Sequence, residues 1–140
     1  MSVEEQNKEV CIKFMTTSPP GSFDLLAEDL SWTIIGKESG SELKGAQTKE
    51  QFIADLAGAG NTKGLDNASE KIFPKGLRLK IHGVIAEGNK GALEAESFAD
   101  TSTGKKYNNV YHFLFELRDG KIITLREYMD TAHQIDVIKN

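Results

Sequence analysis

Residues 104–131 read GKKYNNVYHFLFELRDGKIITLREYMDT and predict a β-hairpin around which the rest of the chain packs. Asp119-Gly120 lies between two runs rich in aromatic and β-branched residues. Such a pair is a strong hairpin signal, because glycine adopts a positive φ at little steric cost. Side chains alternate across a strand, so one face of the first strand carries Tyr107, Asn109, Tyr111, Phe113 and Phe115. The opposite face carries Asn108, Val110, His112, Leu114 and Glu116.

The second strand of the hairpin has one acid between apolar neighbours. Alternation places Glu127 on the same face as Ile123, Leu125 and Met129. The opposite face carries Ile122, Thr124, Arg126, Tyr128 and Asp130. Both faces include apolar groups, so we expect neither to be fully solvated.

The N-terminal half predicts three helices and one strand. An apolar stripe at helical spacing, which includes a buried Cys11, predicts a helix over residues 3–16. A second, short helix is expected at about residues 22–30, and a strand over 31–36 with Trp32 and Ile34 on one face. Thr48 and Gln51 form a capping-box pattern that begins the third helix.

The remaining strands precede the hairpin. Residues 77–82 alternate in polarity, residues 88–91 form a turn, and residues 92–99 form a strand with Glu94, Glu96 and Phe98 on one face. The long segment 61–75 has no clear period, and we expect it to border a pocket. Helices followed by antiparallel strands indicate an α+β fold in which a curved sheet carries helices on one face.

Length and charge narrow the function classes. The 140 residues indicate a single domain over 1–140. The net charge of −4 and the absence of a Lys/Arg run argue against nucleic acid as a partner. The sequence has no apolar run long enough for a membrane span and no signal peptide, so we predict a cytoplasmic protein without a membrane partner.

The chemistry available is that of carboxylates. The three histidines have no metal-ligand spacing, and no glycine-rich phosphate loop is present, so we predict no metal and no cofactor. Glu94, Glu96 and Glu127 lie on otherwise apolar strand faces. Desolvation raises the pKa of such a group, and a second carboxylate adds to the rise. Glu127 is then either a general acid or base, or a structural acid that is exposed or ion-paired.

The sequence resembles the nuclear transport factor 2-like superfamily, in the branch of SnoaL-like polyketide cyclases, limonene epoxide hydrolases and ketosteroid isomerase. The resemblance covers nearly the whole chain and rests on LLAEDLSWTI (25–34), GALEAES (91–97) and the hairpin itself. It implies a cone-shaped domain, with a curved, mostly antiparallel sheet and three N-terminal helices packed on its concave face. It also implies a deep apolar pocket and a dimer formed through the outer face of the sheet.

The epoxide hydrolases of this superfamily use two acids, an arginine, a tyrosine and an asparagine. By local match, the two acids fall on Glu127 and Glu96, and the arginine falls on Glu94. The tyrosine falls on Trp32 and the asparagine on Ile34. Three of the five positions change character, which disfavours epoxide hydrolysis.

The resemblance therefore favours a cofactor-independent isomerase or cyclase that moves a proton next to a carbonyl group in a small apolar substrate such as a polyketide, terpenoid or steroid. Glu127 is the expected base and Glu96 the expected partner acid. The expected lining of the substrate pocket is Trp32, Ile34, Glu94, Phe98, Asn109, Tyr111, Phe113 and Leu125. The alternatives are a non-catalytic domain that binds an apolar ligand and, less favoured, an epoxide hydrolase.

The face opposite this pocket predicts a homodimer. Val110, His112 and Leu114, with Thr124 and Tyr128 beside them, would form an exposed apolar patch in a monomer. We expect a two-fold partner to cover this patch.

Overall fold

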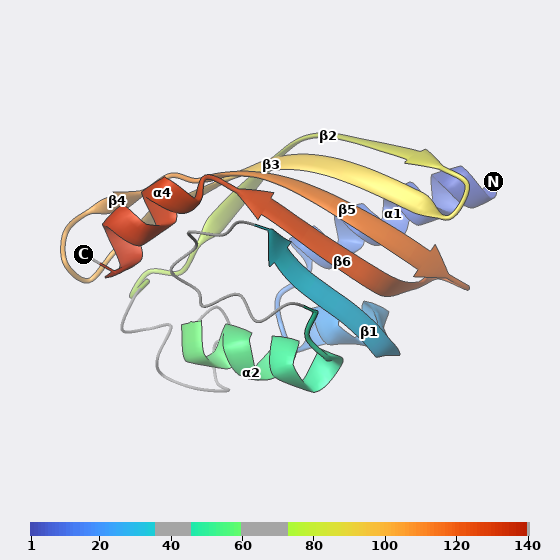
Figure 1. Cartoon of the computed structure of the whole chain (residues 1–140). Helices are drawn as coiled ribbons and strands as arrows, with labels where there is room; N and C mark the ends of the chain where they lie inside the picture. Colours follow the sequence, from blue (N-terminus) through green and yellow to red (C-terminus); the bar gives the residue numbers. More distant parts are fainter. Residues whose placement is uncertain (36–45, 60–72, 140) are drawn as a thin grey trace.

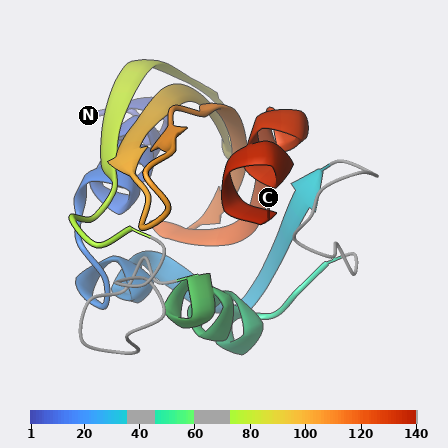
Figure 2. The same ribbon diagram turned by 90° about the vertical axis from the view of Figure 1, so that its left-hand side faces the viewer.

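The computed structural model describes residues 1–35, 46–59 and 73–139, which form a strongly curved sheet with helices against it (Figures 1 and 2). The helical elements are α1 (Val3–Thr16), the 3-10 helix η1 (Gly21–Leu25), α2 (Lys49–Ala59), α4 (Thr131–Gln134) and the π-helix η2 (Ile135–Lys139). The strands are β1 (Leu26–Ile35), β2 (Arg78–Glu87), β3 (Lys90–Asp100), β4 (Lys106–Tyr107), β5 (Val110–Arg118) and β6 (Lys121–Met129).

The sheet has the strand order β1-β6-β5-β3-β2, and β4 pairs with β3. β1 runs parallel to β6, and the other pairs are antiparallel. The predicted α+β class with a curved, mostly antiparallel sheet is confirmed. None of the helices in the described segments combines the length and the apolar character of a bilayer span.

The β5–β6 hairpin forms as the sequence predicts. Asp119 and Gly120 have φ values of 51° and 78°, so both turn residues adopt the left-handed conformation that this two-residue turn requires. Arg118 pairs with Lys121 across the turn. The capping box at α2 also forms: the Thr48 N–H donates to Gln51 Oε1 at 2.8 Å, and the Gln51 N–H donates to Thr48 Oγ1 at 3.2 Å.

The inner face of the sheet forms the main core with α1 and α2. Phe14 of α1 meets the ring of Phe115 edge to face at 6.3 Å, and Phe52 of α2 meets Trp32 at 4.7 Å. Cys11 is fully buried in this core, and its burial raises the pKa of its thiol to about 12. The expected structural role of Cys11 agrees with this environment.

Three element predictions are corrected by strand pairing. The helix expected over 22–30 is wrong beyond Leu25, because β6 supplies a parallel partner and residues 26–35 join the sheet. The first hairpin strand is interrupted: Tyr107 belongs to β4, and β5 begins at Val110. A bulge in β6 opposite Glu116 and Leu117 turns Ile122 inward, so Ile122 and Leu125 share the core rather than opposite faces.

Gly91 marks a close approach between β3 and α1. A Cβ atom added at Gly91 would lie 2.8 Å from Cys11 Sγ, which is closer than van der Waals contact allows. We therefore expect Gly91→Ala to lower the free energy of unfolding, measured by urea denaturation, by about 1–3 kcal/mol, as overpacked core positions do.

Two controls separate this contact from a general cost of alanine in a strand. In the Cys11→Ala background, Gly91→Ala should cost clearly less, because the clashing sulfur is gone. Gly83→Ala in β2, where a Cβ atom would meet nothing within 4 Å, should change stability by less than about 0.5 kcal/mol. An equal loss from Gly91→Ala in both backgrounds would contradict the packing argument.

Candidate functional site

Glu127 and Trp32 meet on the inner face of the sheet. The parallel register of β1 and β6 pairs Trp32 with Leu125 and Ile34 with Glu127. The indole Nε1–H of Trp32 donates a hydrogen bond to Glu127 Oε1 at 3.0 Å. Trp32 is only 3% exposed, so the packed indole fixes the carboxylate in one orientation.

The surroundings of Glu127 are mostly apolar, as the sequence predicts. Phe113 of β5 pairs with Glu127 across the sheet, and Tyr111 pairs with Met129. Of the predicted lining residues, the inner face brings together Trp32, Ile34, Tyr111, Phe113 and Leu125. Their roles in binding a substrate stay predictions, whereas their common location follows from the register.

A cluster of buried hydroxyls, those of Ser97, Tyr107 and Tyr111, lies on the same face. The Tyr111 hydroxyl donates to the Tyr107 oxygen at 3.1 Å and lies 3.0 Å from Ser97 Oγ. The Asn109 amide Nδ2 donates to the Tyr107 oxygen at 2.9 Å. Burial raises the pKa of both tyrosines, and the charge of Glu127 raises both further. Both hydroxyls therefore stay protonated and within electrostatic reach of the Glu127 carboxyl.

Asn109 holds this group in place. The predicted lining residue Asn109 is fully buried; its Nδ2 donates to the Asp130 carbonyl at 3.1 Å, and its Oδ1 accepts the Asp130 N–H at 3.2 Å. These bonds tie the start of β5 to the end of β6. Ser97 is a site residue that the sequence did not single out, although alternation along β3 separates it from Glu96.

Glu96, Glu94 and Phe98 are corrected: they face away from the inner surface. On β3 the buried side chains are Leu93, Ala95 and Ser97, and the three predicted site residues alternate with them. Small and apolar residues face inward here because α1 packs closely on β3, as Gly91 and Cys11 demonstrate. Glu96 is therefore not a neighbour of Glu127 on the inner face, and the expected pair of interacting carboxylates does not form.

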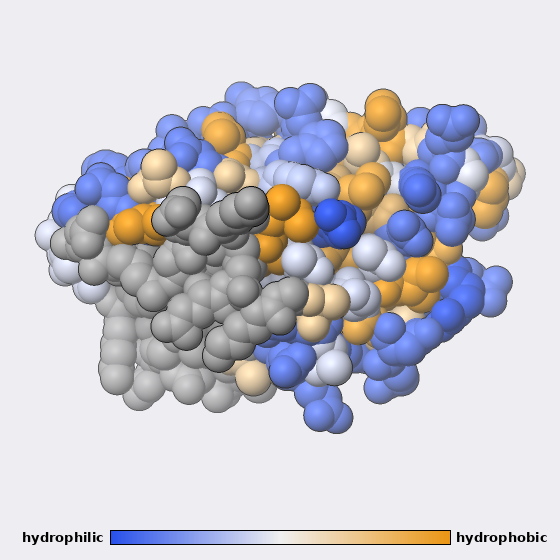
Figure 3. All heavy atoms as spheres, in the orientation of Figure 1, coloured by the Kyte–Doolittle hydropathy of each residue, from blue (hydrophilic) through white to orange (hydrophobic). Residues whose placement is uncertain are grey.

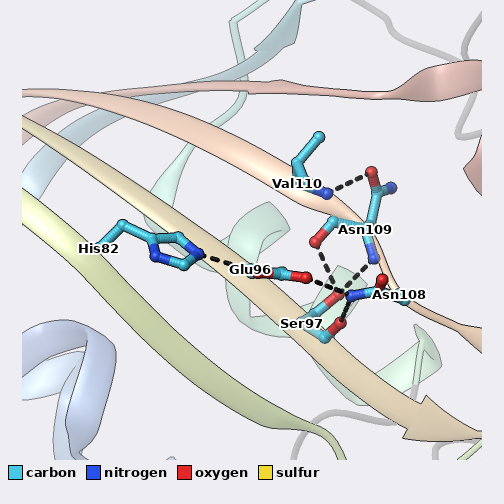
Figure 4. A network of polar contacts seen from close by, with 6 residues as sticks. All are labelled: His82, Glu96, Ser97, Asn108, Asn109 and Val110. Carbon is cyan, nitrogen blue, oxygen red and sulfur yellow. Dashed lines mark hydrogen bonds and ion pairs between the residues drawn. The ribbon is translucent and has the colours of Figure 1, made fainter.

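Glu96 has its own polar partners on the outer face (Figure 4). His82 Nε2 lies 2.9 Å from Glu96 Oε1, and the Asn108 amide Nδ2 donates to Glu96 Oε2 at 2.9 Å. The same amide nitrogen donates to the Ser97 carbonyl at 2.9 Å. The bond from Asn108, followed by the one from His82, holds the pKa of Glu96 below its usual range, which is opposite to the expected rise.

A hollow of about 660 Å³ opens where β2, β3 and β4 come together. It is lined by residues 75–78, 98–100 and 106–108. Phe98 lines this hollow rather than the inner face near Trp32. Tyr107 lines it as well, so one residue of the cluster of buried hydroxyls also belongs to the wall of the hollow.

Two other predictions concern metal or cofactor binding and the segment 61–75. Within the described segments, no three His, Cys, Asp or Glu side chains are grouped so that they could hold a metal ion; the absence of a metal or an organic cofactor stays a prediction. The segment 61–75, expected to border a pocket, falls mostly outside the described residues. Its last residue, Lys75, lines the hollow.

The hydrogen bonds to Glu96 make its titration a direct test of this geometry. Carboxyl-carbon NMR should give Glu96 a titration midpoint below the usual glutamate pKa of about 4.3, and Asn108→Ala should move the midpoint upward. Because the folded-state pKa is depressed, the contribution of these bonds to stability is present above the unfolded pKa and is lost as the pH falls through the folded pKa. A midpoint at or above the usual value would contradict the outer-face placement.

Comparison with known proteins identifies the fold. No family model and no curated protein sequence matches the chain, but solved structures do. An NTF2-like protein of unknown function from Burkholderia pseudomallei K96243 is 19% identical, with both chains fully covered and a TM-score of 0.75. A protein from Jannaschia sp. CCS1 that carries the name of a SnoaL-like polyketide cyclase is 19% identical, with 99% of this chain and 94% of that chain covered and a TM-score of 0.72.

An LEH-like epoxide hydrolase from M. tuberculosis is 18% identical, with 99% of this chain and 92% of that chain covered and a TM-score of 0.68. At these identities the likeness establishes the fold and not the activity. The chain thus has the nuclear transport factor 2-like fold that these three structures share.

Proposed function

We propose that this protein is a cofactor-independent isomerase or cyclase that transfers a proton next to the carbonyl group of a small apolar substrate. The observation that carries the proposal is the half-buried Glu127 carboxylate, fixed by the Trp32 indole on an apolar inner face. A carboxylate in such a place is suited to act as a general base. The name of the Jannaschia protein, a SnoaL-like polyketide cyclase, agrees with this reaction class.

In the proposed reaction Glu127 removes a proton from the carbon next to the substrate carbonyl. The C–H electron pair moves to form an enolate, and Glu127 becomes a carboxylic acid. Glu127 then returns the proton to another carbon, which isomerises the substrate, or the enolate carbon attacks a second carbonyl, which closes a ring. In the second case, Glu127 returns its proton to the new alkoxide, and no oxidant or reductant is needed.

The cluster of buried hydroxyls supplies the hydrogen-bond donor that the proposed reaction also needs. Tyr107 and Tyr111 are kept protonated by burial and by the charge of Glu127. A neutral hydroxyl near the base is the kind of donor that stabilises an enolate oxygen. Glu96 has no part in this mechanism, because its carboxyl lies on the outer face with His82 and Asn108.

The two alternatives differ from this proposal in turnover. A non-catalytic domain would bind an apolar carbonyl compound without exchanging its protons. Epoxide hydrolysis is disfavoured by the residues that stand at the arginine and asparagine positions of those enzymes: Glu94 lies on the outer face and is exposed, and Ile34 has no amide group.

The test of the mechanism is Glu127→Gln, which keeps the shape of the side chain and removes its basicity. A panel of cyclic ketones and 1,3-diketones in deuterated water, followed by mass spectrometry, detects enzyme-dependent exchange of protons next to a carbonyl. For any compound that exchanges, Glu127→Gln should slow the exchange by about 10²–10⁴-fold, the usual effect of losing a general base.

Glu94→Gln is the matched control, because Glu94 is a glutamate of the same sheet on the other face. It should exchange protons at nearly the wild-type rate. Full activity in Glu127→Gln, or equal losses in both variants, would remove Glu127 from the mechanism. Saturable binding of a panel compound without exchange would favour the non-catalytic alternative.

We also propose that the outer face of the sheet forms a two-fold homodimer. Val110 is 55% exposed and Ile85 is 72% exposed, and apolar groups lie among hydrophilic ones over the strands on the face seen in Figure 3. Leu114 of β5 and Tyr128 of β6 are half-buried. A second copy would cover these groups.

Sedimentation velocity tests the assembly. At tens of micromolar, roughly the range where a standard interface holds, the wild type should sediment as a dimer and Val110→Glu as a monomer. Ile12→Glu is the matched control, because Ile12 is an exposed apolar residue of α1, away from the outer face. A wild-type protein that sediments as a monomer would refute the proposal.

A further inference from the structure

The hollow at the ends of β2, β3 and β4 carries a charge opposite to that of the whole protein. Its lining includes three cations, Lys75, Arg78 and Lys106, and one anion, Asp100. Three positive charges and one negative charge give a local charge of +2, whereas the whole chain carries −4. Such a local reversal in a concave surface concentrates anions there.

Two of the three cations have no ion pair in the described part of the chain. Lys106 pairs with Asp100, and neither Lys75 nor Arg78 takes part in any of the ion pairs formed by the described residues. Lys75 is close enough to contribute to the lowered pKa of Asp100, after Lys106. The positive charge of this surface is therefore only partly neutralised.

The guanidinium of Arg78 lies over the aromatic ring of Phe98. Its guanidinium carbon lies 5.1 Å from the centre of the Phe98 ring, and Arg78 and Phe98 are cross-strand partners of β2 and β3. A cation over an aromatic face is stabilised by the ring. The N–H groups at the edge of a guanidinium held in this way form the fork that suits a carboxylate.

Apart from Asn108, the uncharged part of the lining is apolar or aromatic. Leu77 and Ala99 are aliphatic, and Phe98 and Tyr107 add two rings. A volume of about 660 Å³ lies within the range of small-molecule sites. The surface thus combines an apolar wall for a flat ring with cations for an attached negative group.

We propose that this hollow binds an aromatic carboxylate, with Arg78 and Lys75 facing the carboxylate and the ring lying against Phe98 and Tyr107. The proposal goes beyond the catalytic role of Glu127 and stands whether or not the protein is an enzyme. Its residues come from the ends of three strands and from residues 75–77 just before β2. Of the cluster of buried hydroxyls, the hollow shares Tyr107.

The experiment is a ¹H–¹⁵N NMR titration of the full chain with 2-naphthoate. Shift changes should concentrate in residues 75–78, 98–100 and 106–108. Two further probes separate the parts of the ligand: 2-naphthalenemethanol has the ring without the charge, and inorganic phosphate has charge without the ring. Each should bind at least about tenfold more weakly, the loss expected when one charge-assisted hydrogen bond or its apolar counterpart is removed.

Variants give an independent measurement. Arg78→Gln should weaken 2-naphthoate binding by about tenfold, and Phe98→Leu should weaken it while leaving the charge unchanged. Lys80→Gln is the matched control, because Lys80 is the next cation on the same face of β2 and lies outside the lining; it should change the affinity by less than about twofold.

Several results would overturn the proposal. These are shift changes centred on Trp32 and Glu127 instead of the hollow, equal affinity for 2-naphthoate and 2-naphthalenemethanol, or unchanged affinity in both Arg78→Gln and Phe98→Leu. Phosphate that binds as tightly as 2-naphthoate would reduce the site to a general anion site and would equally refute the aromatic class.

Discussion

The position of β6 between β5 and β1 is the constraint on which the rest of the structure depends. Antiparallel pairing on one side places Phe113 beside Glu127, and parallel pairing on the other side places Ile34 there. A shift of one residue in either register would turn the carboxylate to the opposite face. The hydrogen bond from Trp32, 95 residues away in the chain, forms only because both registers hold.

The sheet separates two polar groups of different character. On the inner face Tyr107, Tyr111 and Asn109 surround a buried set of hydrogen bonds with Ser97. On the outer face Glu96 is bonded to His82 and Asn108. The consecutive residues Asn108 and Asn109 serve one group each, because successive side chains leave a strand-like backbone on opposite sides. Burial raises the pKa of the tyrosines in the inner group, whereas the hydrogen bonds with Asn108 and His82 lower the pKa of Glu96 in the outer group.

The sequence by itself determined the elements whose signals are local. The Asp119-Gly120 turn, the capping box at Thr48 and the helix over 3–16 depend on residues within a few positions of each other. Alternation in the hairpin likewise placed Tyr107, Asn109, Tyr111, Phe113 and Phe115 on one face, and this face is the inner one. Alternation also placed Glu127 among apolar neighbours, as the structure has it, because the period of two is fixed; its catalytic role stays a prediction.

The tertiary structure alone decided which face of β3 and which segment near residue 26 belong to the core. Alternation along β3 separates Glu96 from Ser97 but does not tell which of them faces inward. The packing of α1 decides it, because Cys11 of α1 lies directly against Gly91 and so covers the face that carries Ser97. Leu26 and Leu30 are spaced like one helical turn, yet the parallel edge of β6 draws them into a strand. Each outcome depends on a partner far away in the chain, and the free energy of that contact outweighs the local preference.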